Sequence, residues 1–219
     1  MDQHVKTLAH LFLDGEEDKA LHFTEELLNE YSLMSFYEAI ITPAMYYIGE
    51  LWETNQISVA DEHLATAICD FVISQIKGKE TVRSGNDQSS GRALFFGMEE
   101  EQHYIGLKMV SESFKAHGYQ VRYLGPNLSL EHSLIQINKF KPEVIGLSAA
   151  LSYRLPGLKE IIKRFSELEW KPLIMIGGRM ARKFALEELE ADQVMIVKDL
   201  HHLSKWFEEG REGLINETS

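Results

Sequence analysis

The spacing of the apolar residues changes near residue 90, and this change limits the folds open to the chain. Up to residue 79, apolar residues recur every three or four positions, as on one face of an α-helix. Beyond residue 91, short apolar runs alternate with helical patterns; the runs are Ala93–Gly97, Gln120–Leu124, Val144–Ser148, Leu173–Ile176 and Val194–Val197. Five strands that alternate with helices predict a doubly wound parallel sheet.

The helices of this second part are expected between and after the apolar runs, near residues 102–117, 129–139, 155–168, 180–189 and 199–209. Together with the five strands they predict an α/β domain of the flavodoxin-like type over residues 92–219. Ligands of such domains bind outside the carboxyl ends of the strands, where the strand order reverses. Candidate binding residues are therefore sought just after the apolar runs.

The first 79 residues predict a four-helix bundle. Ser35 reads as the N-cap of the third helix, with Glu38 at the capping-box position. Pro43 should kink that helix or restart it, because proline lacks the N–H that a helix interior requires. The fourth helix is expected from about Ser58 to Lys77. Residues 80–91 are polar and rich in serine and glycine, which predicts a linker between the two domains.

The chain carries a formal charge of −12, and almost all of it lies in the predicted bundle. Residues 1–80 sum to −11 and residues 81–219 to −1. Contacts with phosphate need lysine and arginine, so direct binding to nucleic acid is not expected. Two interpretations remain for the acidic half: solvated helix faces, or a docking surface for a basic partner such as a DNA-binding protein.

The chain has no apolar run near the ~20 residues that a membrane-spanning helix needs, and its N-terminus lacks the pattern of a signal peptide. Cys69 is the only cysteine among 219 residues, which excludes an internal disulfide and a thiolate cluster. The expected location is the cytoplasm.

Three residues that follow the first apolar run have the types and spacing of a one-sided metal site: Glu101, His103 and Gly106. The imidazole of His103 offers one nitrogen to a metal. The carboxylate of Glu101 can accept a hydrogen bond from the other ring nitrogen, which fixes the tautomer and raises the basicity of the ligand. Gly106 would let a bulky ligand approach the helix backbone.

Small residues follow two other strands of the predicted sheet. Ser148 ends the third apolar run, and Gly177 and Gly178 follow the fourth. They would leave room for a long ligand beside the sheet. Small residues are also common in such loops, so these positions alone do not decide between a pocket and an ordinary connection.

The Glu101-x-His103-x-x-Gly106 pattern resembles the Asp-x-His-x-x-Gly signature of cobalamin (vitamin B12)-binding domains, with Glu in place of Asp. The resemblance implies that His103 is the lower axial ligand of cobalt. It also implies that the displaced nucleotide tail of the cofactor enters a pocket beside Ser148, Gly177 and Gly178. Two positions depart from the family: Ala150 replaces the usual Leu, and Leu107 stands where many methyl-carrying corrinoid proteins have Lys.

The helical half adds a second pattern, in which nine residues separate Trp52 from the pair Glu62-His63. From the residues alone, Trp52 reads as a core aromatic and the pair as an exposed first helical turn. The spacing resembles the helical domain of light-sensing, adenosylcobalamin-binding transcription regulators of the CarH type. It implies that Trp52 caps the upper face of cobalt, with Val59, Glu62 and His63 beside the adenosyl group.

That family also has a histidine directly after the capping tryptophan, which ligates cobalt after light breaks the cobalt–carbon bond. The present chain has Glu53 there, which leaves His63 as the candidate substitute. These regulators carry a DNA-binding domain as well, for which no segment of this sequence is expected.

Three hypotheses follow. The first is a non-enzymatic sensor that binds adenosylcobalamin, as a photoreceptor or B12 sensor, and signals through a transcription regulator or by forming homo-oligomers. The second is a corrinoid carrier that holds a methyl group, as methylcobalamin, for a methyltransferase. The third is an interaction module that binds no cofactor. None of them requires a membrane or direct contact with nucleic acid.

Overall fold

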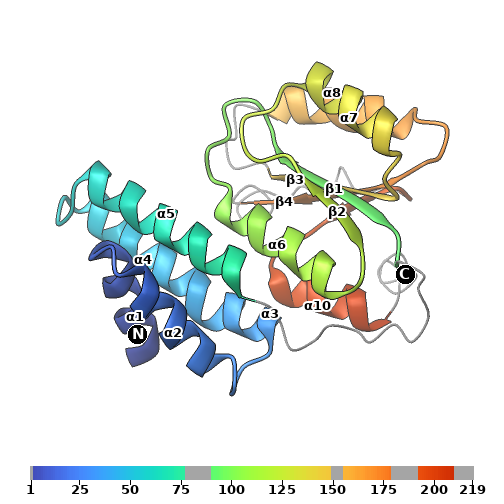
Figure 1. Cartoon of the computed structure of the whole chain (residues 1–219). Helices are drawn as coiled ribbons and strands as arrows, with labels where there is room; N and C mark the ends of the chain where they lie inside the picture. The colour runs from blue at the N-terminus through green and yellow to red at the C-terminus, as the bar shows by residue number, and fades with distance from the viewer. Residues whose placement is uncertain (1, 77–89, 149–154, 179–191, 210–219) are drawn as a thin grey trace. The chain divides into compact units, whose positions relative to one another are not determined.

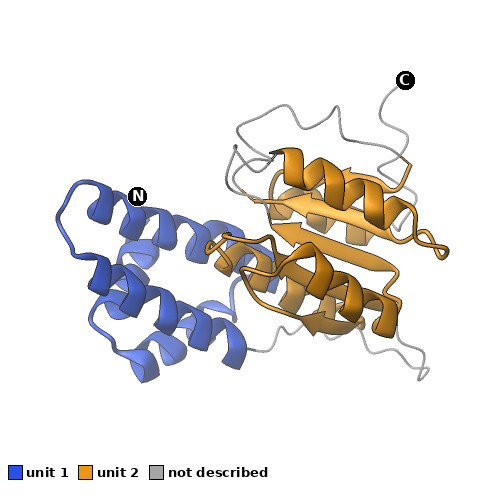
Figure 2. Ribbon diagram, turned by 90° about the horizontal axis from the view of Figure 1, so that it is seen from above, with its two compact units in different colours: residues 1–81 blue, residues 82–219 orange. Residues whose placement is uncertain are grey.

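The computed structural model describes residues 2–76, 90–148, 155–178 and 192–209 of the chain (Figure 1). It divides into two compact units, residues 1–81 and 82–219 (Figure 2). Most of the predicted linker 80–91 and the predicted helix 180–189 lie outside the described residues. None of the helices described is long and apolar enough to cross a membrane.

The first unit consists of helices whose apolar sides meet in one core. Their bounds are α1 Gln3–Leu13, α2 Glu17–Leu27, α3 Leu33–Phe36, η1 Tyr37–Ile41, α4 Thr42–Glu53 and α5 Val59–Gln75. Leu8 and Phe12 of α1 and Ile48 of α4 are fully buried, as are Cys69 and Val72 of α5. Burial in this apolar core raises the pKa of the Cys69 thiol, which keeps it protonated and inert.

The third helical stretch starts three residues earlier than expected. The prediction of Ser35 as N-cap is wrong: Ser32 caps α3, and its hydroxyl accepts a hydrogen bond from the backbone N–H of Ser35 at 3.2 Å. Pro43 lies in the first turn of α4, where a missing N–H costs little. The π-helical turn η1 precedes it, and the backbone of Ile41 and Thr42 stays in the right-handed helical region, so the helical path continues through this point.

The second unit is a five-stranded parallel sheet in the order β2-β1-β3-β4-β5. The strands are β1 Arg92–Gly97, β2 Gln120–Tyr123, β3 Val144–Ser148, β4 Leu173–Gly177 and β5 Val194–Ile196. The helices described are α6 Ile105–Ala116, α7 Leu130–Phe140, α8 Leu155–Ser166 and α10 Leu200–Glu209. This order is the flavodoxin-like one, so the predicted fold class is confirmed. The strand order reverses between β1 and β3.

Helices cover both faces of the sheet (Figure 1). On one face, Ile137 and Phe140 of α7 and Phe165 of α8 share a core with Phe96 of β1. On the other face, Phe95 of β1 contacts Phe114 of α6 edge to face, with ring centroids 4.9 Å apart. Alternate residues of each strand therefore belong to different cores.

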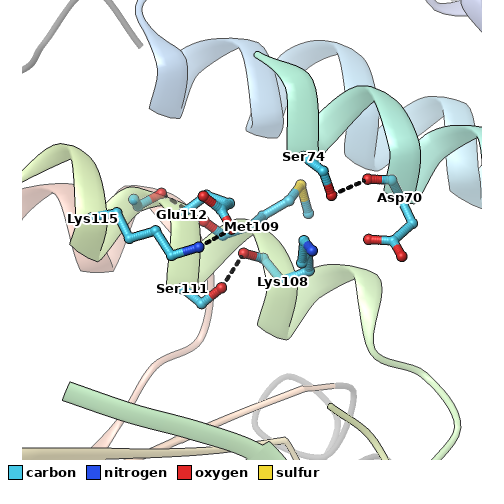
Figure 3. Close-up of polar contacts among 8 residues, drawn as sticks. Asp70, Ser74, Lys108, Met109, Ser111, Glu112 and Lys115 are labelled. Atoms are coloured by element: carbon cyan, nitrogen blue, oxygen red, sulfur yellow. Dashed lines mark hydrogen bonds and ion pairs between the residues drawn. The ribbon is translucent and has the colours of Figure 1, made fainter. Parts of the chain in front are cut away.

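Helix α6 carries buried serines on an otherwise apolar side, and each is satisfied locally. Figure 3 shows the hydroxyl of Ser111 donating to the carbonyl of Lys108 at 2.8 Å. The hydroxyl of Ser113 donates to the carbonyl of Met109, also at 2.8 Å. On the polar side, Lys115 pairs with Glu112 at 2.7 Å (Figure 3). Because the serine hydroxyls are paired within the helix, α6 can pack against the sheet without leaving them unsatisfied.

Candidate functional site

His103 lies in the loop between β1 and α6, two residues before the helix begins. The helix expected from residue 102 thus starts three residues later, at Ile105. One oxygen of the Glu101 carboxylate, Oε1, accepts hydrogen bonds from the backbone N–H of His103 and from its ring nitrogen Nδ1, both at 2.8 Å. The Glu101 side chain is 3% exposed and the His103 side chain 49%. A buried carboxylate therefore holds a half-exposed imidazole.

The hydrogen bond to Glu101 sets the chemistry of the imidazole. A carboxylate oxygen accepts, so Nδ1 is the donor, and the lone pair of the neutral ring lies on Nε2. Within the described residues, Nε2 of His103 has no hydrogen-bond partner. A single free imidazole nitrogen, oriented by a carboxylate, suits an axial ligand to a metal whose remaining ligands come from a macrocycle.

Contacts from two other segments fix the loop that carries His103. The side-chain oxygen of Asn127 accepts from the backbone N–H of Glu100 at 2.8 Å, and Met98 forms a β-bridge with Leu128. The hydroxyl of Ser148 lies 3.5 Å from the carbonyl oxygen of His103, a long contact. Asn127 was not among the predicted site residues, although Gly125-Pro126-Asn127 is a strong turn signal that marks this loop.

The last residues of three neighbouring strands form a row of small side chains. Gly97, Ser148 and Gly177 are partners in register across β1, β3 and β4. They lie on the sheet face that α6 covers, because Phe95, two residues before Gly97, packs on α6. A Cβ on Gly97 would lie 3.1 Å from the Cα of Pro126, so the fold itself favours glycine there.

Gly178 follows β4 with a φ of 103°, a backbone conformation that favours glycine. The positions of Ala149 and Ala150 lie outside the described residues.

Gly106 is an exposed residue in the first turn of α6. A Cβ built on it meets no described atom within 4 Å. Packing within the described part of the chain therefore does not require a glycine here. What the glycine provides is bare helix backbone three residues after His103.

The helical unit presents its four predicted residues on its surface. Trp52, near the C-terminal end of α4, is 47% exposed, and Val59, the first residue of α5, is 53% exposed. The interpretation of Trp52 as a bundle-core aromatic is therefore wrong. Glu62 accepts a hydrogen bond from the Thr66 hydroxyl at 3.0 Å, and its other oxygen lies 3.7 Å from Nε2 of His63. Sequence reasoning missed Thr66.

The ten predicted residues thus fall into two groups. Six share the carboxyl edge of the sheet in the second unit: Glu101, His103, Gly106, Ser148, Gly177 and Gly178. The remaining four belong to α4 and α5 of the first unit.

Known proteins match the chain along most of its length. Dimethylamine corrinoid protein 1 of Methanosarcina acetivorans is 22% identical over 194 residues, which cover 87% of this chain and 90% of that protein. The HTH-type transcriptional repressor CarH of Myxococcus xanthus is 24% identical over 162 residues, which cover 72% of this chain but 52% of the repressor.

A solved structure has the same fold. The Methanosarcina barkeri monomethylamine corrinoid protein superposes with a TM-score of 0.71 at 18% identity, covering 95% of this chain and 99% of that one. Two family profiles also match, both described as B12 binding domain, one over residues 5–77 and the other over residues 91–199. The chain therefore belongs to the family of B12-binding domain proteins.

Proposed function

We propose that this chain is a corrinoid carrier that holds a methyl group for a methyltransferase, with His103 as the lower axial ligand of cobalt. The observation that carries the proposal is the Glu101–His103 pair, in which a buried carboxylate fixes Nδ1 and leaves Nε2 free. A corrinoid supplies a cobalt atom that accepts and releases a methyl group. The chain itself then binds and orients the cofactor, and the partner enzyme performs the catalysis.

Each residue at the edge of the sheet has a role in this proposal. Glu101 raises the basicity of His103 and fixes its ring, as outer partners of metal-bound imidazoles do. Gly106 allows the corrin ring to approach the start of α6. Ser148, Gly177 and Gly178 would receive the nucleotide tail, since they are small residues at the ends of two neighbouring strands.

The relatives support a carrier more strongly than a sensor. Proteins named as dimethylamine corrinoid proteins align with this chain over most of both lengths. The CarH repressor aligns over about half of its own length, 52%. The partner that fits a carrier is a methyltransferase, and the form of the cofactor that fits is methylcobalamin.

A sensor of adenosylcobalamin is the second candidate, and the surface of the helical unit favours it. Trp52 and Val59 expose apolar side chains there, at 47% and 53%. Glu62 lies one turn after Val59 and is held by Thr66, which suits a carboxylate that accepts hydroxyl groups from an upper ligand. In this case the partner would be a transcription regulator.

An absorption titration with hydroxocobalamin tests cofactor binding and the role of His103. The wild-type protein should bind hydroxocobalamin, and the absorption spectrum of the corrin should shift because His103 would replace the lower ligand of cobalt. His103→Ala should lose this shift, while His132→Ala, which removes an exposed imidazole from α7, should keep it. An identical spectrum for wild type and His103→Ala would contradict the assignment of the ligand.

A comparison of two cofactor forms separates the carrier from the sensor. The protein would be loaded in the dark with methylcobalamin or adenosylcobalamin and passed over a size-exclusion column before and after green light. A carrier should bind methylcobalamin and keep its elution volume when the adenosyl form is illuminated. A change in elution volume that follows the loss of the adenosyl group would favour the sensor.

A further inference from the structure

Two loops at the amino edge of the sheet, the edge opposite to His103, place a lysine in the same strained backbone conformation. Lys141 lies between α7 and β3, and Lys171 lies between α8 and β4. Their φ angles are 48° and 47°, in the left-handed region that favours glycine or asparagine. Both lysines are exposed. Lysine is a poor choice for this conformation, which indicates that the two side chains serve more than the fold.

The two loops are joined to each other through Trp170. Its indole Nε1–H donates to the carbonyl oxygen of Pro142 at 2.9 Å. The Nζ of Lys141 lies 5.8 Å from the centroid of the Trp170 ring, and the Nζ of Lys171 donates to the carbonyl oxygen of Ser166 at 2.6 Å. Both ammonium groups are therefore held in place at the ends of two neighbouring strands, β3 and β4.

Three further cations extend this edge across β1 and β2. Arg122 of β2 lies over the ring of Phe140, with its Cζ 4.2 Å from the ring centroid, and the Cζ of Arg92 in β1 lies 6.0 Å from the same centroid. Lys139 is exposed in the last turn of α7. The five cations are called the basic platform: Arg92, Arg122, Lys139, Lys141 and Lys171.

The carboxylates near the basic platform neutralise it only in part. Oε1 of Glu143 lies 3.8 Å from Nε of Arg92 and forms an ion pair with it. Glu167 and Glu169 are exposed in the segment between α8 and β4. Within the described residues, none of the three lysines of the platform forms an ion pair with a carboxylate. These ammonium groups are therefore available to a negatively charged partner.

The helical unit carries the opposite charge on the exposed side of α2. Residues 16–30 contain six carboxylates and a single lysine. Glu25, Glu26 and Glu30 are exposed at the C-terminal end of this helix, where the helix dipole disfavours negative charge. Oε1 of Glu26 lies 3.4 Å from Nε2 of His22, and the other two form no ion pair within the described residues. These charges are unfavourable for the helix that carries them.

We infer that the basic platform of one copy of this chain binds the acidic side of α2 in a second copy. The two surfaces have opposite charge, and their lengths agree. The platform crosses four strands, about 14 Å at the usual spacing between strands, and the 11 residues of α2 span about 16 Å. Each copy carries both surfaces, so two copies can pair reciprocally. The contact leaves the carboxyl edge of the sheet free and does not depend on the proposed function.

Sedimentation velocity of the wild-type protein tests this contact at about 20 mM and about 500 mM NaCl. At the low salt concentration, the sedimentation coefficient should rise with protein concentration. At the high concentration it should stay at the monomer value, because salt screens exposed charges. A protein that is monomeric at both, or that associates equally at both, would overturn the inference. A monomer would leave the basic platform to an acidic partner other than a second copy.

Two charge-reversal variants identify the surfaces. The platform variant carries Lys139→Glu, Lys141→Glu and Lys171→Glu, and the α2 variant carries Glu25→Lys, Glu26→Lys and Glu30→Lys. In each variant alone, like charges would face each other, so the dissociation constant of self-association should rise at least about tenfold. An equimolar mixture of the two should associate like the wild type, because every contact between unlike variants joins opposite charges.

The matched control carries Glu38→Lys, Glu50→Lys and Glu53→Lys. These exposed carboxylates belong to η1 and α4, and their reversal changes the net charge by the same amount as the α2 variant does. The control should self-associate like the wild type. An equal loss of association in the control, or a mixture of the two variants that stays monomeric, would overturn the inference. Corrinoid binding is measured separately, so either result leaves the proposed function standing.

Discussion

At the scale of single residues, one carboxylate oxygen organises the candidate site. Oε1 of Glu101 binds both the backbone N–H and the ring Nδ1 of His103, so the backbone conformation of the loop and the orientation of the ring are set by the same atom. Burial of Glu101 strengthens this arrangement, because hydrogen bonds to a carboxylate are stronger away from water. The imidazole is pre-oriented before any ligand arrives.

Glu101→Gln tests this organisation. The amide has nearly the shape of the carboxylate but no charge, so it should leave His103 less basic as a ligand. Affinity for hydroxocobalamin should fall by about 10–100-fold, the usual effect of changing an outer partner of a metal-bound histidine. Glu99→Gln, an exposed neighbour in the same loop, is the control. Equal affinities for the two variants would argue against the role of Glu101.

Gly106→Ala tests whether this glycine is required for folding or for binding of the cofactor. An added methyl group meets no described atom within 4 Å, and alanine is the better helix former by about 0.5–1 kcal/mol. The free energy of unfolding of the free protein should therefore stay the same or rise, by up to about 1 kcal/mol, in a urea titration. Cobalamin affinity should nevertheless fall.

The opposite pattern for Gly106→Ala, a less stable protein with unchanged affinity, would mean that this glycine serves the fold. It would then play no part in the approach of the corrin ring to α6.

At the scale of elements, the start of α5 is a stabilised helix end that carries two of the predicted site residues, Val59 and Glu62. Ser58 and Asp61 form a capping box: the Ser58 hydroxyl accepts from the N–H of Asp61 at 3.3 Å, and the Asp61 carboxylate accepts from the N–H of Ser58 at 2.8 Å. The backbone N–H of Ser58 and the Ser58 hydroxyl, which donates to the same carboxylate oxygen at 2.7 Å, hold the pKa of the Asp61 carboxyl below its usual value. Val59 and Glu62 are thus presented on a fixed first turn.

Ser58→Ala should destabilise the protein by about 1 kcal/mol, as expected for the loss of an N-cap, measured by urea denaturation at neutral pH. The contribution of the Asp61 carboxylate to the stability of the protein depends on pH in one direction. Because the folded-state pKa of Asp61 is lowered, its stabilisation is present above the unfolded-state pKa and is lost as the pH falls through the folded-state value. No loss of stability in Ser58→Ala would show that tertiary packing alone holds this turn.

The pairing of β1 with β3 contains the tightest glycine contact in the sheet. Gly146→Ala would place a methyl group against the Phe95 ring, at 2.2 Å from Cδ1 before any adjustment. Overpacking of this kind costs about 1–3 kcal/mol of unfolding free energy. Adding Phe95→Leu should recover part of this loss, so that the double variant is more stable than the sum of the single effects predicts.

Gly49→Ala in α4 is the control for this experiment, because a Cβ there meets no described atom within 4 Å. It should leave stability unchanged or slightly raised. Additive effects of Gly146→Ala and Phe95→Leu would contradict the contact.

At the scale of the whole molecule, the sequence predicted the features that a short stretch of residues encodes, namely strands, the residues at their ends and contacts within one loop. The buried strands are short apolar runs, and β3 was predicted with the bounds that the structure has, Val144–Ser148. The position of Ser148 and Gly177 at strand ends followed from the same runs. The spacing of Glu101 and His103 also anticipated their hydrogen bond, since both residues lie in one loop.

The features that the sequence did not predict have two physical causes. Either neighbouring residues compete for the same role, or residues far apart in the sequence come into contact. Ser32 and Ser35 are both good cap residues, and pattern alone did not show that Ser32 would cap α3. The contact of Phe95 with Gly146 depends on the register of β1 against β3, which no local pattern encodes. Thr66 and His63 both lie within about one helical turn of Glu62, so the pattern did not show that Thr66 would donate a hydrogen bond to it.

The most direct test of the central claim is the identity of the atom that ligates cobalt. The protein would be produced with ¹⁵N-labelled histidine, loaded with hydroxocobalamin, reduced to the paramagnetic Co(II) form and examined by electron paramagnetic resonance. Coordination by His103 predicts that each cobalt line splits into two, because ¹⁵N has a nuclear spin of one half, and that His103→Ala loses this splitting. A three-line splitting in the labelled wild-type protein would show that the unlabelled benzimidazole of the cofactor remains the ligand, and would contradict the account.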